Sequence, residues 1–273
     1  MATSQLIGGR FGLSGTPVFL YHGLARLSAR QRPLCERKYW VSTAQFRDHL
    51  ALIHREGRQV VLLRELWNST DVSKRQNLQV ALTFDDGNSS DYEIAFPLLL
   101  EAGYRAEFFV NTSTVGTKGF LNWQQIGEMQ RAGMSFQSHS HDHVYLSRLS
   151  LLETERQLKL SKQILEDRLG REVEFVAVPY GDLSSETIEV AKRTSYRALC
   201  TSWSWPARPG AILVNRVVLY SFTDQYGYKK LLSGSPASYA IRAGREAALF
   251  LPKRLLLRFL RPQAVATVQE DLS

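Results

Sequence analysis

Cysteine is nearly absent from this sequence, in which Cys35 and Cys200 are the two occurrences among 273 residues. Two thiols so far apart match no zinc or redox spacing and cannot build a disulfide framework. Long apolar runs are absent too, because no stretch reaches the roughly 18 residues that a membrane-spanning helix needs. The N-terminus shows no basic segment followed by an apolar one, so we predict no secretory signal and a cytoplasmic protein.

Acidic residues are fewer than basic ones, with 26 Asp and Glu against 34 Lys and Arg, which gives a formal net charge of +8. This excess favours an anionic partner such as a phospholipid surface or a phosphate-bearing glycan carrier. Nucleic acid would match the sign of the charge, but no nucleic-acid-binding motif occurs, so we expect no such partner. The 44% of hydrophobic residues supplies enough apolar material for an ordinary globular core.

Short apolar runs alternate with longer amphipathic segments along most of the chain. We expect strands at these runs, which are 17–21, 60–63, 78–84, 105–110, 134–138, 174–178 and 196–201. Helical patterns separate them, and the clearest lies at 150–169. Strands that alternate with helices indicate βαβ units around a parallel sheet. About seven such strands suit a closed α/β barrel better than an open sheet.

The barrel pattern stops near residue 235, so we predict a barrel domain at 1–235 and a basic helical tail at 236–273. Within the tail, the segment 245–261 includes KRLLLRFLR, which places basic side chains on one helical face and leucines on the other. Such a helix either contacts the inner membrane face peripherally or packs on the barrel with a solvated edge. Both alternatives are open.

Three polar clusters each follow a predicted strand, where an α/β barrel builds its active site. The first contains Asp85 and Asp86, followed by Gly87. Adjacent carboxylates repel each other unless a cation lies nearby, and Gly87 permits a tight turn that directs both into one pocket. Because the same pattern is typical of a surface turn, this cluster alone does not decide between the two.

The second cluster holds three of the six histidines, His139, His141 and His143. Residues four apart share one face of a helical turn, so we expect His139 and His143 to converge and His141 to point elsewhere. Two imidazoles and one carboxylate are a common ligand set for zinc and leave room for water. A solvated polar loop is the alternative, and Asp142 either orients a ligand imidazole or lies in solvent.

The third cluster is the turn at 178–182, in which Tyr180 follows Pro179. A rigid turn of this kind can present a backbone N–H to an oxyanion, although most such turns have no catalytic role. Trp203 and Trp205 follow another predicted strand end. We expect these two rings, with Pro179, to contact a substrate sugar; core packing or a capping loop is the alternative.

The segments TFDDG at 83–87, HSHDH at 139–143 and PYG at 179–181 resemble, in this order, the NodB-homology polysaccharide deacetylase family (carbohydrate esterase family 4). The resemblance spans roughly residues 15–220. It implies a distorted, NodB-like (β/α) barrel and a hydrolase that removes acetyl groups from the amino sugars of a glycan or glycolipid.

Carried over by position, the resemblance implies Asp85 as the general base. It implies Asp86, His139 and His143 as ligands of a divalent metal, zinc first, with cobalt, manganese and nickel as alternatives. Tyr180 would supply a main-chain hydrogen-bond donor to the oxyanion. The expected substrate partner is therefore an N-acetylated saccharide.

Two features depart from the family pattern. Ala177 stands where an arginine often pairs with the base, and no histidine follows His143 to supply the acid that protonates the leaving amine. His22 is our candidate acid, and a core or loop histidine is the alternative interpretation. These departures keep two other functions open, a metal-dependent amidohydrolase on a non-sugar amide and a catalytically silent glycan-binding or scaffold protein.

Overall fold

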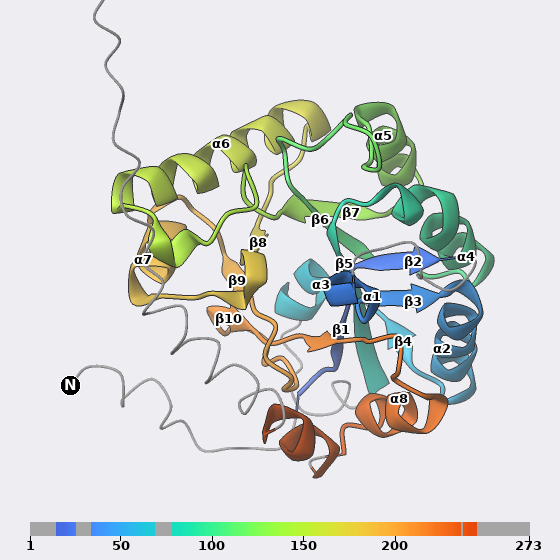
Figure 1. Ribbon diagram of the computed structural model, residues 1–273. Coiled ribbons are helices and arrows are strands. Elements are labelled where there is room, and N and C mark those ends of the chain that lie inside the picture. Colours follow the sequence, from blue (N-terminus) through green and yellow to red (C-terminus); the bar gives the residue numbers. More distant parts are fainter. Residues whose placement is uncertain (1–14, 26–33, 69–77, 236, 245–273) are drawn as a thin grey trace, which may run out of the picture.

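The computed structural model describes residues 15–25, 34–68, 78–235 and 237–244 (Figure 1). The predicted basic segment 245–261 and the N-terminus at 1–14 lie outside these ranges. Within the described ranges, no helix combines the length and the apolar character that crossing a membrane requires. The cytoplasmic location and the peripheral membrane contact therefore stay predictions.

A nine-stranded parallel sheet forms the framework of the molecule. Its strands are β1 (Val18–Tyr21), β4 (Gln59–Val60), β5 (Gln79–Asp86), β6 (Glu107–Val110), β7 (Ser135–Ser138), β8 (Phe175–Ala177), β9 (Ala198–Cys200), β10 (Leu213–Val214) and β11 (Val217–Val218). They are arranged in the order β10-β9-β8-β7-β6-β5-β1-β11, and β4 pairs with β5. Parallel strands that are covered on both faces consist of continuous apolar runs, and every residue of β1 and β6 is buried.

The two edge strands of this sheet, β10 and β11, are neighbours in the chain, because only Asn215 and Arg216 separate them. A connection of this length spans at most about 10 Å, so the two edges of the sheet must lie close together. The sheet is therefore curled into a half-barrel with helices around it (Figure 1). The predicted distorted (β/α) barrel is confirmed, with short strands at the seam that the sequence patterns did not reveal.

Helices surround the curled sheet (Figure 1). They are α1 (Leu34–Arg37), α2 (Thr43–Arg55), α3 (Leu63–Asn68), the π-helical turn Asp91–Ala95 with α4 (Phe96–Glu101), α5 (Trp123–Arg131), α6 (Leu151–Leu169), α7 (Ser185–Arg193) and α8 (Gln225–Leu232). Five of them begin at a side-chain cap that accepts a backbone N–H three residues on, namely Ser42, Asn122, Ser150, Ser184 and Asp224. A small second sheet pairs β2 (Gly23–Ala25) with β3 (Trp40–Ser42).

The strand predicted at 60–63 is shorter than expected, because only Gln59–Val60 pairs with β5. The chain turns into α3 directly afterwards, where the Glu65 carboxylate accepts the Leu62 N–H at 2.9 Å. An apolar run of four residues therefore divides between a strand end and a helix start, which hydrophobicity alone does not distinguish.

The hydrophobic core continues beyond the predicted domain boundary at 235. Tyr239 is fully buried in the main core cluster, and its hydroxyl donates to the carbonyl of Leu231 at 2.8 Å. Side chains inside the curled sheet form a separate cluster, which includes Phe109, Phe175 and Cys200. The open end of this interior holds the polar residues described next.

Candidate active site

Polar side chains from several strand ends meet at the carboxyl edge of the sheet. Asp86 is the last residue of β5, His139 follows β7, Tyr180 follows β8, and Arg216 lies between β10 and β11. Because all of these strands are parallel, their carboxyl ends face the same side of the barrel. Residues that are far apart in the sequence are thereby brought to one place.

Asp86, His139 and His143 converge closely. The Asp86 Oδ1 atom lies 3.4 Å from His139 Nε2 and 3.3 Å from His143 Nε2, and the three candidate ligand atoms lie within 4.8 Å of one another. Among the residues that the structure describes, this is the one group of three or more His, Cys, Asp or Glu side chains with such geometry. The predicted convergence is confirmed.

The histidine segment does not form the helical turn that we expected. It is an irregular bend in which Ser140 and His143 have positive φ angles of 65° and 52°. The Ser140 hydroxyl accepts the His143 N–H at 3.2 Å and stabilises the bend. Asp86 also has a positive φ, of 76°. Non-glycine residues held in this region cost free energy and cluster at functional sites, so the local strain itself indicates a site.

Hydrogen bonding fixes the orientation of His139. Its Nδ1 atom lies 2.9 Å from the carbonyl oxygen of Ala177 and donates to it, which directs Nε2 at Asp86. Burial raises the pKa of Asp86, but the hydrogen bond from His139 and the nearby imidazoles outweigh it, and the net shift is downward. Asp86 is therefore ionised at neutral pH.

Burial and the neighbouring His139 lower the pKa of His143 to about 4. His143 is therefore a neutral imidazole, the form that binds a metal ion. One carboxylate oxygen and two imidazole nitrogens that face a common point are a donor set suited to a divalent cation, and three protein ligands leave a coordination position open. The residues present thus fit a divalent metal site.

His141 and Asp142 anchor the histidine segment to its surroundings. His141 points away from the triad, as expected, and its Nδ1 atom is hydrogen-bonded to the Thr112 hydroxyl at 2.7 Å. The Asp142 carboxylate accepts hydrogen bonds from Gln157 at 2.6 Å and Arg156 at 3.2 Å. Asp142 therefore connects the loop to α6, and no hydrogen bond joins it to either triad imidazole within the described residues.

Asp85 lies beside the triad and is held by an arginine. Arg216 donates from Nη1 and Nη2 to the two carboxylate oxygens of Asp85, both at 2.7 Å. A third bond, from Arg216 Nε to the carbonyl of Thr201 at 3.1 Å, anchors the guanidinium. Both side chains are almost completely buried, and Asp85 Oδ2 is 4.0 Å from His139 Nε2.

Sequence reasoning missed Arg216. It looked for the arginine at the position of Ala177, whose carbonyl instead orients His139. The signal that could have found Arg216 is the run AILVNRVVLY at 211–220, in which one arginine interrupts a strongly apolar segment. Charged residues are almost never fully buried unless they are paired.

His22 follows β1 and lies at the same end of the barrel. Its side chain is half-buried, and its buried Nδ1 atom has no hydrogen-bond partner among the described residues. Burial lowers the pKa of His22 against the opposing effects of Asp86 and Asp85. His22 therefore lies close enough to Asp85 and Asp86 for their charges to act on its pKa. No direct hydrogen bond joins it to either carboxylate among the described residues.

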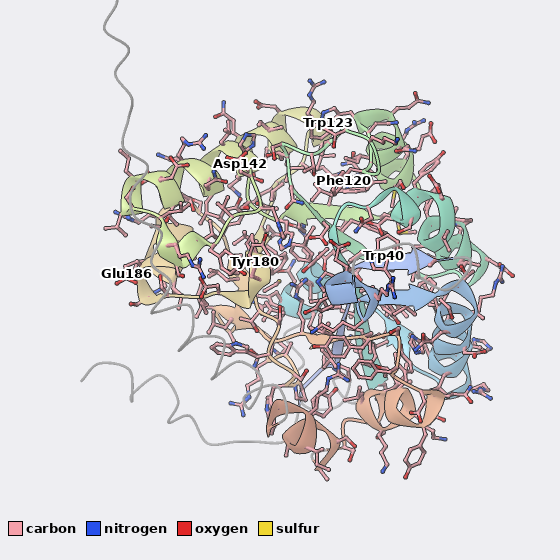
Figure 2. All side chains as sticks on the ribbon, in the orientation of Figure 1. Trp40, Phe120, Trp123, Asp142, Tyr180 and Glu186 are labelled. Carbon is pink, nitrogen blue, oxygen red and sulfur yellow. The ribbon has the colours of Figure 1, made fainter. Side chains whose placement is uncertain are left out.

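These residues line an open cleft of about 740 Å³. Its walls also carry aromatic side chains, among which Tyr180, Trp40 and Phe120 are labelled in Figure 2. Tyr180 has a φ of 60°, stacks on Tyr145 with a centroid distance of 4.0 Å, and contacts the His143 ring at 4.7 Å.

Three residues expected to bind substrate do not line this cleft. Pro179 is buried beneath the turn. Trp205 is partly buried and packs edge-on against Tyr239 at 6.2 Å, which agrees with the core-packing alternative. Trp203 is 48% exposed but is not among the cleft residues. A contact between these residues and a sugar stays a prediction.

The chain matches a family model described as "Polysaccharide deacetylase" over residues 73–199. This segment contains Asp85, Asp86, His139, His143 and Tyr180. "Putative polysaccharide deacetylase YxkH" of Bacillus subtilis is 26% identical over 196 residues, which cover 71% of this chain and 65% of the relative. A "Poly-beta-1,6-N-acetyl-D-glucosamine N-deacetylase" of Staphylococcus aureus is 25% identical over 175 residues, covering 59% and 60%. The chain thus spans somewhat less than two thirds of the length of these relatives.

Solved structures agree with the fold. The Streptococcus pyogenes deacetylase PplD in complex with acetate superposes with a TM-score of 0.70 and 26% identity, covering 81% of this chain and 99% of that one. IcaB from Ammonifex degensii gives a TM-score of 0.70 at 24% identity, covering 81% and 97%. The family model, the relatives and the solved structures agree with one another, and the chain is similar to polysaccharide deacetylases in both sequence and fold.

Proposed function

We propose that the protein is a metal-dependent hydrolase that removes N-acetyl groups from an amino-sugar-containing glycan or glycolipid. The observation that carries this proposal is the convergence of Asp86, His139 and His143 next to the ion-paired Asp85. The match to the polysaccharide deacetylase family model supports it, as do the names of the relatives.

Asp86, His139 and His143 would hold the divalent ion. Zinc is our first choice, and cobalt, manganese and nickel are alternatives. When bound, such an ion supplies Lewis acidity, which polarises an acetamide carbonyl and lowers the pKa of water. The orientation of His139 by the Ala177 carbonyl supports the assignment, because ligand histidines usually donate their second N–H to such a group.

Asp85 is the proposed general base. Two parallel hydrogen bonds from Arg216 fix the plane of its carboxylate. Its Oδ2 atom lies next to the triad, 4.0 Å from His139 Nε2. From there the carboxylate can take the proton of a water molecule as that water attacks the acetamide carbon.

The remaining steps require an oxyanion donor and an acid. The main-chain N–H of Tyr180, in the strained turn beside His143, is the proposed donor. Protonated His22 is the proposed acid, which donates to the amide nitrogen as the carbon–nitrogen bond breaks. Without this proton the amine cannot leave. The products are acetate and the free amino sugar.

Metal analysis combined with acetate release from N-acetylglucosamine oligomers tests this proposal. We expect about one equivalent of metal per chain and acetate release that Asp85→Asn abolishes while the metal stays bound. Metal without acetate release would favour an amidohydrolase for a non-sugar amide. A chain that binds neither metal nor releases acetate would favour a catalytically silent glycan-binding protein.

A further inference from the structure

A row of aromatic rings leads out of the cleft beside His22. The His22 ring lies 4.8 Å from the Tyr39 ring, and Tyr39 lies 5.6 Å from Tyr220. Tyr220 in turn stacks on Phe222 at 5.0 Å, with 16° between the ring planes. Tyr39 and Tyr220 line the cleft, whereas Phe222 lies beyond it and is 71% exposed. The row therefore ends in an open aromatic face at the surface.

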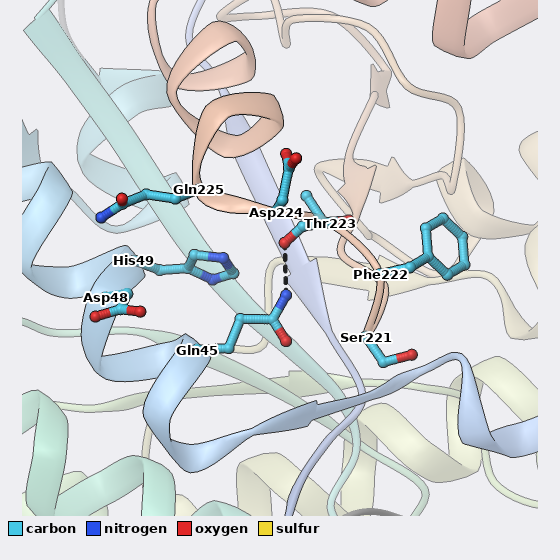
Figure 3. Close-up of a pocket in the computed structure, with 8 residues that line it drawn as sticks. All are labelled: Gln45, Asp48, His49, Ser221, Phe222, Thr223, Asp224 and Gln225. Atoms are coloured by element: carbon cyan, nitrogen blue, oxygen red, sulfur yellow. Dashed lines mark hydrogen bonds between the residues drawn. The ribbon is translucent and has the colours of Figure 1, made fainter.

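Hydrogen bonds fix the loop that carries Phe222. Gln45 of α2 donates from Nε2 to the carbonyl oxygens of Tyr220 and Thr223, the second of which is drawn in Figure 3. The Thr223 hydroxyl accepts the Tyr220 N–H at 3.2 Å. A fixed loop loses little conformational entropy when it binds a ligand, so the exposed ring is held ready for contact.

A second pocket, of about 350 Å³, lies against the same loop (Figure 3). Its lining includes Gln45, Asp48, Phe222, Thr223 and Gln225. The exposed carboxylate of Asp48 and the amide of Gln225 can hydrogen-bond to hydroxyl groups. Phe222 offers an apolar face beside them. An apolar face next to several polar groups matches the chemistry of a sugar ring, which has C–H faces and hydroxyl edges.

We infer that the loop at 219–225 forms a distal saccharide subsite. A sugar some units away from the reacting N-acetyl group packs on Phe222 and hydrogen-bonds to the polar side chains of the second pocket. We assign a saccharide to this subsite because the row of rings is continuous with the proposed active site. It begins in the cleft lined by Asp86 and ends at Phe222. The inference rests on the proposed function and specifies its substrate as a long glycan chain rather than a mono- or disaccharide.

Binding of two N-acetylglucosamine oligomers, a dimer and a pentamer, tests this inference. Calorimetry would use the full zinc-loaded chain carrying Asp85→Asn, so that bound saccharide is not hydrolysed. We expect Phe222→Ala to reduce the pentamer-to-dimer affinity ratio about tenfold, the loss expected for one aromatic contact. Tyr226→Ala is the matched control, because Tyr226 is 66% exposed on α8 and lines neither cavity; it should leave the ratio unchanged.

An unchanged ratio in Phe222→Ala would overturn the inference, as would an equal loss for both oligomers or the absence of any oligomer binding. Loss of binding to anionic phospholipid vesicles in Phe222→Ala, with the oligomer ratio intact, would assign the exposed ring to a membrane instead. The proposed function is tested separately by acetate release from the same oligomers with the wild-type chain. Saccharide binding with the predicted ratio but no acetate would contradict only the proposed activity.

Discussion

The guanidinium of Arg216 forms two hydrogen bonds of 2.7 Å with the carboxylate of Asp85, from a position 131 residues away in the sequence. Arg216 lies at the seam where the two edges of the sheet approach each other, and it also binds the Thr201 carbonyl after β9. The ion pair therefore joins strands from both sides of the barrel. It connects the closure of the fold to the orientation of the proposed base.

We predict that Arg216→Gln lowers both the rate of acetate release and the stability of the fold. Loss of the paired hydrogen bonds misorients Asp85, which should reduce kcat about 100-fold. The carboxylate is also left buried without a counter-charge, which should lower the free energy of unfolding by about 3–5 kcal/mol. Steady-state kinetics and urea denaturation measure the two effects.

Arg216→Lys is the control for charge alone. It keeps a cation but cannot make two parallel hydrogen bonds. Compared with Arg216→Gln, we therefore expect it to restore a larger part of the lost stability than of the lost kcat. If Lys restored full activity, the account of Arg216 as a positioning residue would be wrong.

Removal of the metal should abolish acetate release without unfolding the protein. The triad lies at the rim of a core that is packed independently of it, so circular dichroism should be unchanged after chelation. Readdition of zinc should restore the activity, with cobalt, manganese and nickel compared in parallel. His139→Ala should lose the metal, whereas His141→Ala should retain it, because His141 points away from the triad.

The role of His22 can be tested through the leaving group. We expect His22→Gln to slow hydrolysis of an N-acetyl amide about 10²- to 10⁴-fold, the usual contribution of a general acid. An activated aryl acetate needs no proton on its leaving group, so its hydrolysis should change little. Equal losses on both substrates would indicate that His22 has a structural role.

A buried carboxyl outside the site predicts a pH dependence of stability. Burial raises the pKa of Glu107 to about 8, with opposing hydrogen bonds from the Leu63 N–H and the Ser135 hydroxyl. The folded state holds the Glu107 proton more tightly than the unfolded chain does. The stability that protonated Glu107 contributes is therefore complete below pH 4.5 and is lost as the pH rises through about 8. The loss should amount to a few kcal/mol.

Urea denaturation at intervals between pH 5 and 9 measures this effect. Glu107→Gln keeps the shape but removes the titration, so its stability should fall less over this range than that of the wild type. Glu189→Gln is the control, because Glu189 is exposed in a surface ion pair. Parallel pH profiles for the wild type and Glu107→Gln would refute the prediction.

The barrel and the triad were predictable because each depends on a local signal. Buried parallel strands give continuous apolar runs, as in β1 and β5, and polar residues directly after such runs lie at one edge of the sheet. The proximity of Asp86 to His139 and His143 therefore followed from their positions at the ends of two strands, β5 and β7. The five helix caps are likewise readable from single residues such as Ser150.

The features that were missed depend on long-range geometry. Arg216 meets Asp85 only because two very short strands close the barrel, and two-residue strands such as β10 carry no periodic signal. The bend at 139–143 depends on positive φ angles at Ser140 and His143. Such angles are uncommon for residues other than glycine, so the sequence does not predict them there. For Trp205 the sequence left core packing and sugar contact as alternatives, because its packing partner Tyr239 lies beyond the predicted boundary.

Anomalous diffraction at the zinc edge, from crystals of the zinc-loaded protein, tests the central claim most directly. We predict one strong peak in contact with Asp86 Oδ1, His139 Nε2 and His143 Nε2, with Asp85 and Arg216 still paired beside it. A peak bound by other residues, or none at full zinc loading, would contradict the proposed metal centre and the hydrolysis that depends on it.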